Sequence, residues 1–459
     1  MIRRVLSMLA GALLALIFVV GVGLSLAAEP EEELTVPSPE IKLRFMSFAI
    51  FKNDNDFDRS EPLYNANGQT VGYISTIFEP TFSWRPIDQV TLQYTIELGD
   101  NIWSRNDADE RDPTADDIPL LKHKEFWAEV IFPGTGHGSR EGLGLKTGYQ
   151  YVYDPTHLFL DRYMGAAEFF YTWNRIRLSL VAGQIPDSVY EGISTEGPEN
   201  ELAKNNFEHD DYVFAFNSRA IYDELSFGTG LFFRWDKSEI GRPLGLLAPC
   251  FNLVYESRPV TVEFDIVGMA GQHKNAGLGN RDEDRLGGAT QLGVAWTVAG
   301  GPVVFDWNLL AFTGDDGDRY DNYDSGFYYS GWSKSNTIML TENWVRDQYD
   351  NLDERVAEQS AGMFVADQEL SVFATESVRL MAIAGYGMVL DDTNTGDDRT
   401  IGTEVDLGVE WTPYQRHVSL LLMGGSLFPG GAGAKVTNEI DLDATDPVYL
   451  GQGAMRIVF

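Results

Sequence analysis

The sequence predicts an all-β fold, a transmembrane antiparallel β-barrel of about 18 strands. Three observations lead to this prediction. Apolar and polar residues alternate in many segments, short turns alternate with long polar connections, and no apolar run beyond the N-terminal region approaches the roughly 20 residues that a membrane-spanning helix needs. We expect the short turns on the periplasmic side and the long acidic loops on the extracellular side.

The N-terminal region, residues 1–28, has the order of a secretory signal peptide. Arginines precede an apolar run from Leu9 to Leu26, and small residues close it. A retained membrane anchor is the alternative, because the run is near the length of a spanning helix. Both interpretations predict export. We expect residues 29–40 to form a periplasmic segment and residues 41–459 to form an outer-membrane β-barrel.

The composition is strongly acidic. The chain has 69 Asp and Glu residues against 34 Lys and Arg residues, and its formal net charge is −35. Nucleic acid is therefore not an expected partner. Cys250 is the only cysteine, which excludes an intramolecular disulfide, so a closed ladder of strands would have to hold the exported chain together.

Alternation is clearest in residues 90–98 and 401–411. In the second segment one face is apolar and the other carries Glu404, Asp406 and Glu410. A soluble β-sandwich would alternate in the same way, so the period alone does not choose between the two folds.

The connections favour the barrel, because tight turns such as Trp173–Asn174 and Thr412–Pro413 alternate with long polar stretches. The predicted strands are residues 41–53, 71–84, 89–99, 122–132, 142–151, 163–172, 175–184, 211–222, 225–235, 248–257, 259–270, 288–298, 302–312, 362–375, 378–390, 400–412, 417–428 and 448–459. An even count leaves both ends of the barrel on one side of the membrane and all the long loops on the other.

Aromatic residues mark the ends of the predicted strands. The chain ends in Phe459, and a terminal aromatic residue on an alternating strand resembles the insertion signal that the bacterial barrel-assembly machinery reads. Four tryptophans would form girdles at the membrane interfaces or would be ordinary core residues; these are Trp84, Trp173, Trp235 and Trp411.

Two stretches resemble the alginate-export family of outer-membrane barrels. One is Gly148–Arg162, a strand followed by a loop with aspartate and arginine, and the other runs from Gly402–Leu407 to Ser426–Gly430. The resemblance implies an eighteen-stranded barrel that passes an anionic polysaccharide through an arginine-rich lumen.

The polar faces of the strands predict a different lumen. We expect the pore lining to carry both signs of charge: Glu97, Glu125, Glu129, Arg177, Arg219, Arg234, Glu263, Asp265, Asp306, Arg379, Glu404, Asp406, Glu410 and Arg456. A pore selects by the charge that lines it. This mixed to acidic wall favours cations, neutral sugars or small solutes over a polyuronate, and a basic band facing an acidic one, as in ordinary porins, is the alternative.

Two features of the connections suggest further sites. An acidic stretch with a glycine offers oxygen ligands of the kind that calcium prefers, or is simply a solvated loop; its candidate ligands are Asp315, Asp316, Asp318 and Asp321. The long segment from Gly314 to Gln359 would either fold inward or cover the barrel mouth. If it folds inward, the constriction would carry Trp332, Trp344 and Arg346.

Passive passage of a hydrophilic solute or an exopolysaccharide is the expected function. The histidines are scattered without a serine or acidic pairing, so an enzyme is not expected. One alternative is a general, cation-preferring uptake porin, and another is a surface-structural barrel whose loops bind divalent cations. The expected partners are outer-membrane lipid and lipopolysaccharide, the assembly machinery and the solute. No cofactor is expected, and calcium is the only metal candidate.

Overall fold

The structure, a computed structural model, describes the strands, the short turns and part of the long connections. The predicted signal peptide at 1–28 lies outside the described residues, as do residues 29–37 of the segment that follows it. The described residues are 38–52, 71–99, 120–136, 141–185, 211–236, 243–277, 281–298, 301–315, 323–327, 334–341, 362–391, 398–414, 417–437 and 446–459.

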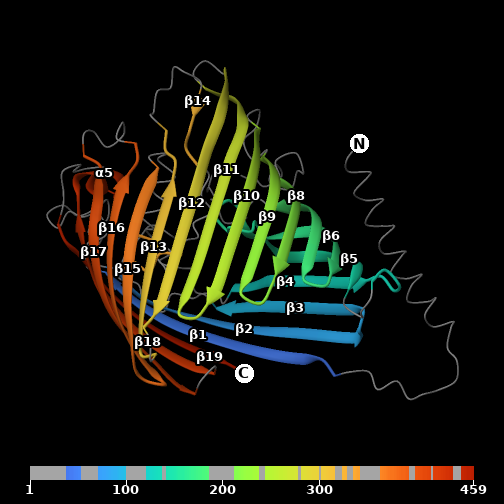
Figure 1. Cartoon of the computed structure of the whole chain (residues 1–459), viewed down its shortest axis with the longest axis horizontal. Helices are drawn as coiled ribbons and strands as arrows, with labels where there is room; N and C mark the ends of the chain where they lie inside the picture. Colours follow the sequence, from blue (N-terminus) through green and yellow to red (C-terminus); the bar gives the residue numbers. More distant parts are fainter. Residues whose placement is uncertain are drawn as a thin grey trace. The chain divides into compact units, whose positions relative to one another are not determined.

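The strands form one sheet that closes into a barrel (Figure 1). Neighbours in the chain pair antiparallel, and β19 pairs with β1 to complete the ring. Eighteen strands make the barrel, as predicted, while β14 is a two-residue strand that pairs parallel to β12. The strands are β1 (Glu40–Lys52), β2 (Val71–Ile87), β3 (Val90–Gly99), β4 (Leu120–Ile131), β5 (Gly142–Tyr153), β6 (Asp161–Trp173), β7 (Ile176–Ile185), β8 (Asp211–Ile221), β9 (Leu225–Asp236), β10 (Leu244–Ser257), β11 (Val260–Gly277), β12 (Arg281–Thr297), β13 (Val303–Phe312), β14 (Tyr323–Asp324), β15 (Met363–Thr375), β16 (Val378–Val389), β17 (Thr400–Tyr414), β18 (Val418–Pro429) and β19 (Val448–Val458).

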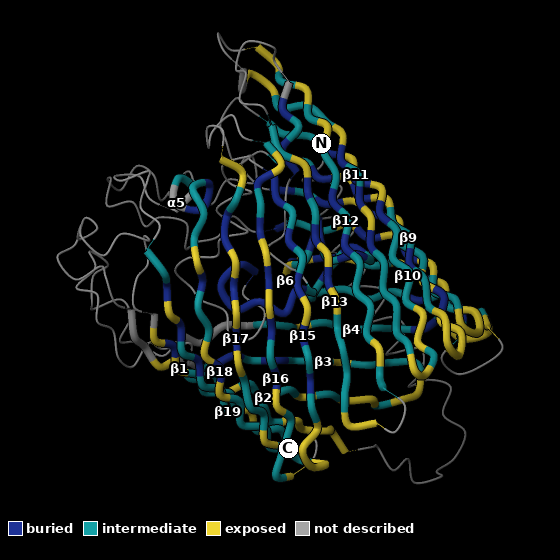
Figure 2. Tube along the Cα trace, turned by 60° about the vertical axis from the view of Figure 1, so that its left-hand side comes forward, coloured by how far each residue is buried: buried dark blue, intermediate teal, exposed yellow. Residues whose placement is uncertain are grey.

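Alternation along the strands places apolar side chains outside the barrel and charged side chains inside. In β17, Val405 and Leu407 are 46% and 66% exposed, whereas Glu404 and Asp406 are both 0% exposed. Figure 2 shows the same change between exposed and buried residues along neighbouring strands. A soluble sandwich would bury the apolar set, so this arrangement is that of a transmembrane barrel.

Aromatic side chains are exposed near the short turns. Trp84, Trp173 and Trp411 lie close to the turns that follow β2, β6 and β17, and all three are exposed. Trp235, near the opposite end of β9, is half-buried. The three exposed tryptophans lie where an interfacial girdle would be.

The apolar core lies inside the barrel, because two connections fold into it. We call residues 154–160, between β5 and β6, the inward loop, and residues 334–341, between β14 and β15, the inner segment. Leu158 and Phe159 of the inward loop and Leu340 of the inner segment are buried in one cluster with inner-face residues such as Phe232. The chain itself therefore narrows the lumen.

Some elements differ from the prediction. β11 runs to Gly277 and β12 starts at Arg281, because polar cross-strand pairs continue the ladder beyond the apolar alternation. One such pair joins Gln272 Nε2 to Asp284 Oδ1 at 3.0 Å. A short helix, α5 (Gly431–Thr437), follows β18 and was not predicted. Within the described ranges, no helix is long and apolar enough to cross a membrane.

The exposed face of β17 gives a test of the membrane topology. Replacing Leu407 by arginine, Leu407→Arg, should lower the free energy of unfolding by about 2–4 kcal/mol, because a charge would enter the apolar band. The same change at the end of the strand, Trp411→Arg, should cost about 1 kcal/mol or less from the charge itself. Urea unfolding of the protein refolded into lipid vesicles measures both. Equal costs at the two positions would contradict a band centred near Leu407.

Candidate functional site

The inward loop takes its shape from Asp154, its first residue. The Asp154 carboxylate accepts hydrogen bonds from the backbone N–H groups of Thr156, Phe159 and Leu160 at 2.8, 3.0 and 2.7 Å. It also accepts one from the Thr156 hydroxyl. Aspartate commonly organises turns in this way. Here the turn leaves the apolar tip of the loop free to pack inside the barrel.

A glycine in the wall makes room for the inward loop. A Cβ atom at Gly228 in β9 would lie 2.8 Å from Cβ of Pro155. Real Cβ atoms do not approach so closely, so a larger residue at this position would have to displace the loop. The loop therefore reaches the inner face of β9.

The inner segment is held by a buried carboxylate of the wall. Glu404 of β17 accepts hydrogen bonds from the backbone N–H groups of Ile338, Met339 and Leu340 at 2.7, 2.9 and 2.8 Å. A buried carboxylate needs such donors, because an unpaired charge away from water is very costly. Glu404 thus fixes the inner segment to β17.

Two further contacts fix the inner segment to other strands. Lys334 forms ion pairs with Glu263, at 2.6 Å, and with Asp265, both in β11. The backbone N–H of Asn336 donates to Asp367 Oδ1 of β15 at 3.2 Å. The inner segment therefore bonds to β11, β15 and β17 and crosses the barrel interior.

A cavity of about 910 Å³ lies inside the barrel, between strands β4–β11 of the wall, the inward loop and Lys334. Its described charged residues are Glu129, Glu168 and Glu263, with Lys146, Arg177, Arg219 and Lys334. Arg177 Nη2 lies 3.1 Å from Glu168 Oε1 and 3.5 Å from Glu129 Oε2. The carboxylates of the cavity are therefore engaged in ion pairs.

Aromatic rings form one side of the cavity. Tyr151, Tyr153 and His157 line it, and the His157 ring stacks on Tyr153 with centroids 4.2 Å apart. Burial, together with the positive charges of Lys334 and Arg219, lowers the pKa of His157 to about 4. The ring is therefore neutral at pH 7, and its Nδ1–H can donate to Asp161 Oδ1, 3.1 Å away.

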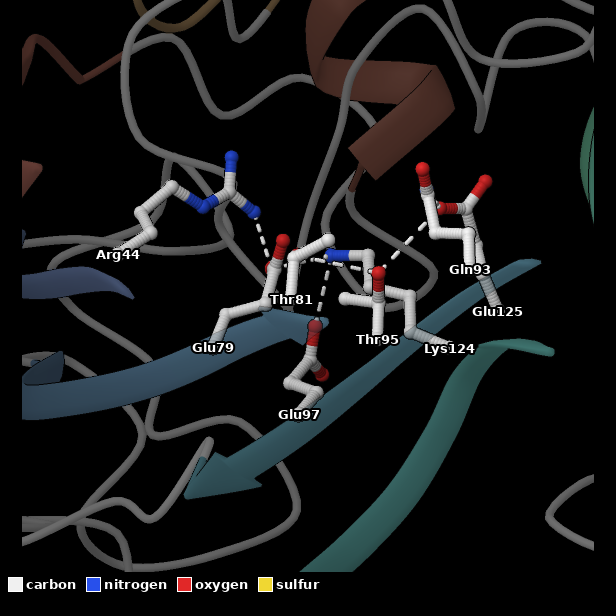
Figure 3. A network of polar contacts seen from close by, with 8 residues as sticks. All are labelled: Arg44, Glu79, Thr81, Gln93, Thr95, Glu97, Lys124 and Glu125. Carbon is white, nitrogen blue, oxygen red and sulfur yellow. Dashed lines mark hydrogen bonds and ion pairs between the residues drawn. The ribbon is translucent and has the colours of Figure 1, made fainter. Parts of the chain in front are cut away.

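A second set of inward polar groups lies on β1–β4 (Figure 3). Lys124 Nζ lies 3.0 Å from Glu79 Oε2 and 2.8 Å from Glu97 Oε2. Arg44 also pairs with Glu79, while Gln93 and Thr95 donate to Glu125. Arg44 and Lys124 therefore neutralise Glu79 and Glu97 within the wall, and Glu125 is held by neutral donors.

The predicted lining residues fall into separate groups. Glu129, Arg177, Arg219 and Glu263 meet at the cavity, and Asp265 adjoins it through Lys334. Away from the cavity, Arg234 pairs with Asp211 at 2.6 Å. Arg379 pairs with Glu369, which lies opposite Asp306 on the neighbouring strand, and Arg379 also lies 3.7 Å from Glu410. Arg456 is exposed.

Glu404 and Asp406 are placed differently from the prediction. Both point into the barrel as expected, but neither has any exposed surface. The inner segment covers Glu404 by donating three backbone hydrogen bonds to it. Neither carboxylate therefore faces open lumen in this structure.

The predicted constriction residues Trp332, Trp344 and Arg346 lie outside the described residues, as do the metal candidates Asp316, Asp318 and Asp321. Asp315, the fourth candidate, accepts a hydrogen bond from the backbone N–H of Ser325 at 3.0 Å. Within the described part of the chain, no group of three or more His, Cys, Asp or Glu side chains could hold a metal ion.

The sequence contains a local signal for the inward loop. A short connection on the long-loop side should be polar, yet this one carries Leu158, Phe159 and Leu160 in succession. Three adjacent apolar residues in a loop indicate that the loop is buried. The preceding Asp154–Thr156 stretch is a turn signal that would have completed this prediction.

Replacing the carboxylate that holds the inner segment, Glu404→Gln, should release that segment. The amide of the variant is neutral, and its NH2 group cannot accept a hydrogen bond from the backbone N–H groups. The free energy that holds the inner segment on β17 should therefore fall by about 2–3 kcal/mol. Amide hydrogen exchange at residues 338–340 should become at least about tenfold faster. The control is Glu410→Gln on the same strand, whose side chain bonds Ser419 at 2.8 Å and not the inner segment. Equal exchange in both variants would contradict the anchoring role.

The neutral His157 makes the stability depend on pH. Its pKa is about 4 in the folded protein and 6.5 ordinarily, so between these values the unfolded chain binds a proton that the folded chain does not. Stability should therefore fall as the pH drops below 6.5. From pH 7 to 5.5 the protein should lose about 1 kcal/mol more than the His157→Gln variant in urea unfolding in detergent micelles. Parallel pH profiles of the two proteins would rule this out.

Comparisons with known proteins identify the fold. No family model matches the chain, and no curated protein matches it. Among solved structures, OccAB1 of Acinetobacter baumannii is similar with a TM-score of 0.55 and 11% identity, covering 94% of this chain and 99% of that one. OccK8 (OprE) of Pseudomonas aeruginosa has a TM-score of 0.52 and 11% identity, covering 92% and 98%. These likenesses support a porin-like barrel, and they give no support to the resemblance to the alginate-export family.

Proposed function

We propose that the chain is an outer-membrane channel of the uptake-porin type, which lets small hydrophilic solutes cross passively. The observation that carries the proposal is a polar cavity, lined by charged side chains of both signs, inside a closed barrel with an apolar outer face. Lipid requires such an exterior, and a hydrated solute requires such an interior. The similar fold of the Occ and Opr structures agrees with it. No catalytic role is assigned.

The two inward connections favour small solutes over a polymer. The inward loop reaches Gly228, and the inner segment bonds to three strands of the wall, so both occupy lumen that an extended polysaccharide would need. A solute whose size matches the cavity can pass more easily than a chain of charged sugars. Uptake of small solutes therefore replaces polymer export as the proposed function.

Insertion into the membrane would follow from the ends of the strands. Exposed Trp84, Trp173 and Trp411 would lie at a lipid interface, and Phe459, which is 72% exposed, would be available to the assembly machinery. The long acidic loops would face lipopolysaccharide.

Single-channel recording of the refolded protein in a planar bilayer tests the proposal. We expect stable ohmic currents, and we expect the Arg219→Glu variant to shift the reversal potential toward cation selectivity, because Arg219 is exposed and lines the cavity. The control is Arg258→Glu, at an exposed turn position away from the cavity. A protein that inserts without conducting would refute the channel. An unchanged reversal potential in the Arg219→Glu variant would show that Arg219 does not line the conducting path.

A further inference from the structure

We propose that the cavity inside the barrel is a binding site for an uncharged saccharide. The inference rests on the proposed channel function and specifies the class of solute. The volume of the cavity, about 910 Å³, falls in the range of small-molecule sites, roughly 300–1,000 Å³. Three properties of the lining point to a sugar rather than to an ion.

The first property is the aromatic side of the cavity. Tyr151 and Tyr153 have ring centroids 5.3 Å apart, and His157 stacks on Tyr153, so the three rings form one aromatic cluster in the lining. The C–H faces of a pyranose ring pack favourably on aromatic rings. A small inorganic anion gains nothing from such a surface. A cation would be attracted to the rings but repelled by Arg219, which lines the same cavity.

The second property is the set of polar groups elsewhere in the lining. Asn217 and Ser218 from β8 and Asn252 from β10 line the cavity. Asn217 Oδ1 is itself buried in the wall beside Gly230. Amide and hydroxyl side chains such as these can donate and accept hydrogen bonds without carrying a charge. Sugar hydroxyls, which also donate and accept, are suited to them.

The third property is that the carboxylates of the cavity are already paired. Glu129 and Glu168 both pair with Arg177, and Glu263 pairs with Lys334 at 2.6 Å. A cation would have to break these pairs to reach a carboxylate. Ion pairs still have free lone pairs and N–H donors at their edges, so they can bond hydroxyl groups without being broken. A neutral polyol therefore fits the lining better than a cation.

The test measures block of the single-channel current by maltotriose, with two comparison solutes. Polyethylene glycol of the same hydrodynamic radius reports steric block alone, and trigalacturonate reports binding of an acidic sugar through Arg219. We expect maltotriose to block at concentrations at least tenfold lower than either comparison solute. Equal block by polyethylene glycol, or stronger block by trigalacturonate, would overturn the assignment.

Variants on two walls of the cavity locate the site. Tyr153→Leu should raise the blocking concentration of maltotriose about tenfold, while Tyr153→Phe, which keeps the ring, should change it less than threefold. Asn217→Ala should raise it several-fold, independently of the aromatic side. The matched control is Tyr255→Leu on the outer face, where the ring is exposed and the block should not change. Block that is unchanged by Tyr153→Leu and Asn217→Ala would refute the site.

The outcomes separate the two proposals. A protein that inserts but carries no current refutes the channel itself. A protein that conducts normally but is not blocked by maltotriose refutes only the saccharide site.

Discussion

The pairing of every backbone N–H and C=O group is the constraint on which this structure depends. In hydrocarbon an unpaired group costs several kcal/mol, so a sheet can cross a membrane only if it has no open edge. The pairing of β1 with β19, from Arg44 opposite Val458 to Lys52 opposite Leu450, removes the last edge. Once the ring is closed, each strand has one face toward lipid and one toward the lumen, and the alternation of side chains follows from that.

Closure places many charges inside, and the structure pairs most of those that it describes. Lys124 lies between Glu79 and Glu97, Arg234 pairs with Asp211, and Glu404 takes three backbone N–H groups. Charges removed from water are tolerated only with such partners. Several residues that the sequence predicts to line the pore therefore stabilise the wall and the inner segment instead. The charge of the lumen cannot be obtained by counting the charged residues on the polar faces of the strands.

The sequence predicts the local features of this fold well and the non-local ones poorly. Strand number and turns are local, since alternation and turn residues are visible within about ten residues. Glu404 was predicted to face inward, but its partner Ile338 is 66 positions away in the chain, and no pattern links the two. The stretch Gly148–Arg162, which resembles a family motif, instead forms the hairpin that carries the inward loop. Its apolar tip and the Asp154–Thr156 turn signal are the local signs of this.

The contacts of the inner segment also constrain the order in which the chain can mature. The segment lies between β13 and β15, but its strongest anchor, Glu404, belongs to β17. Residues 334–341 can therefore be held in their observed position only when β17 is part of the sheet. The width of the lumen thus depends on the C-terminal strands, although the segment that narrows it precedes them in the chain.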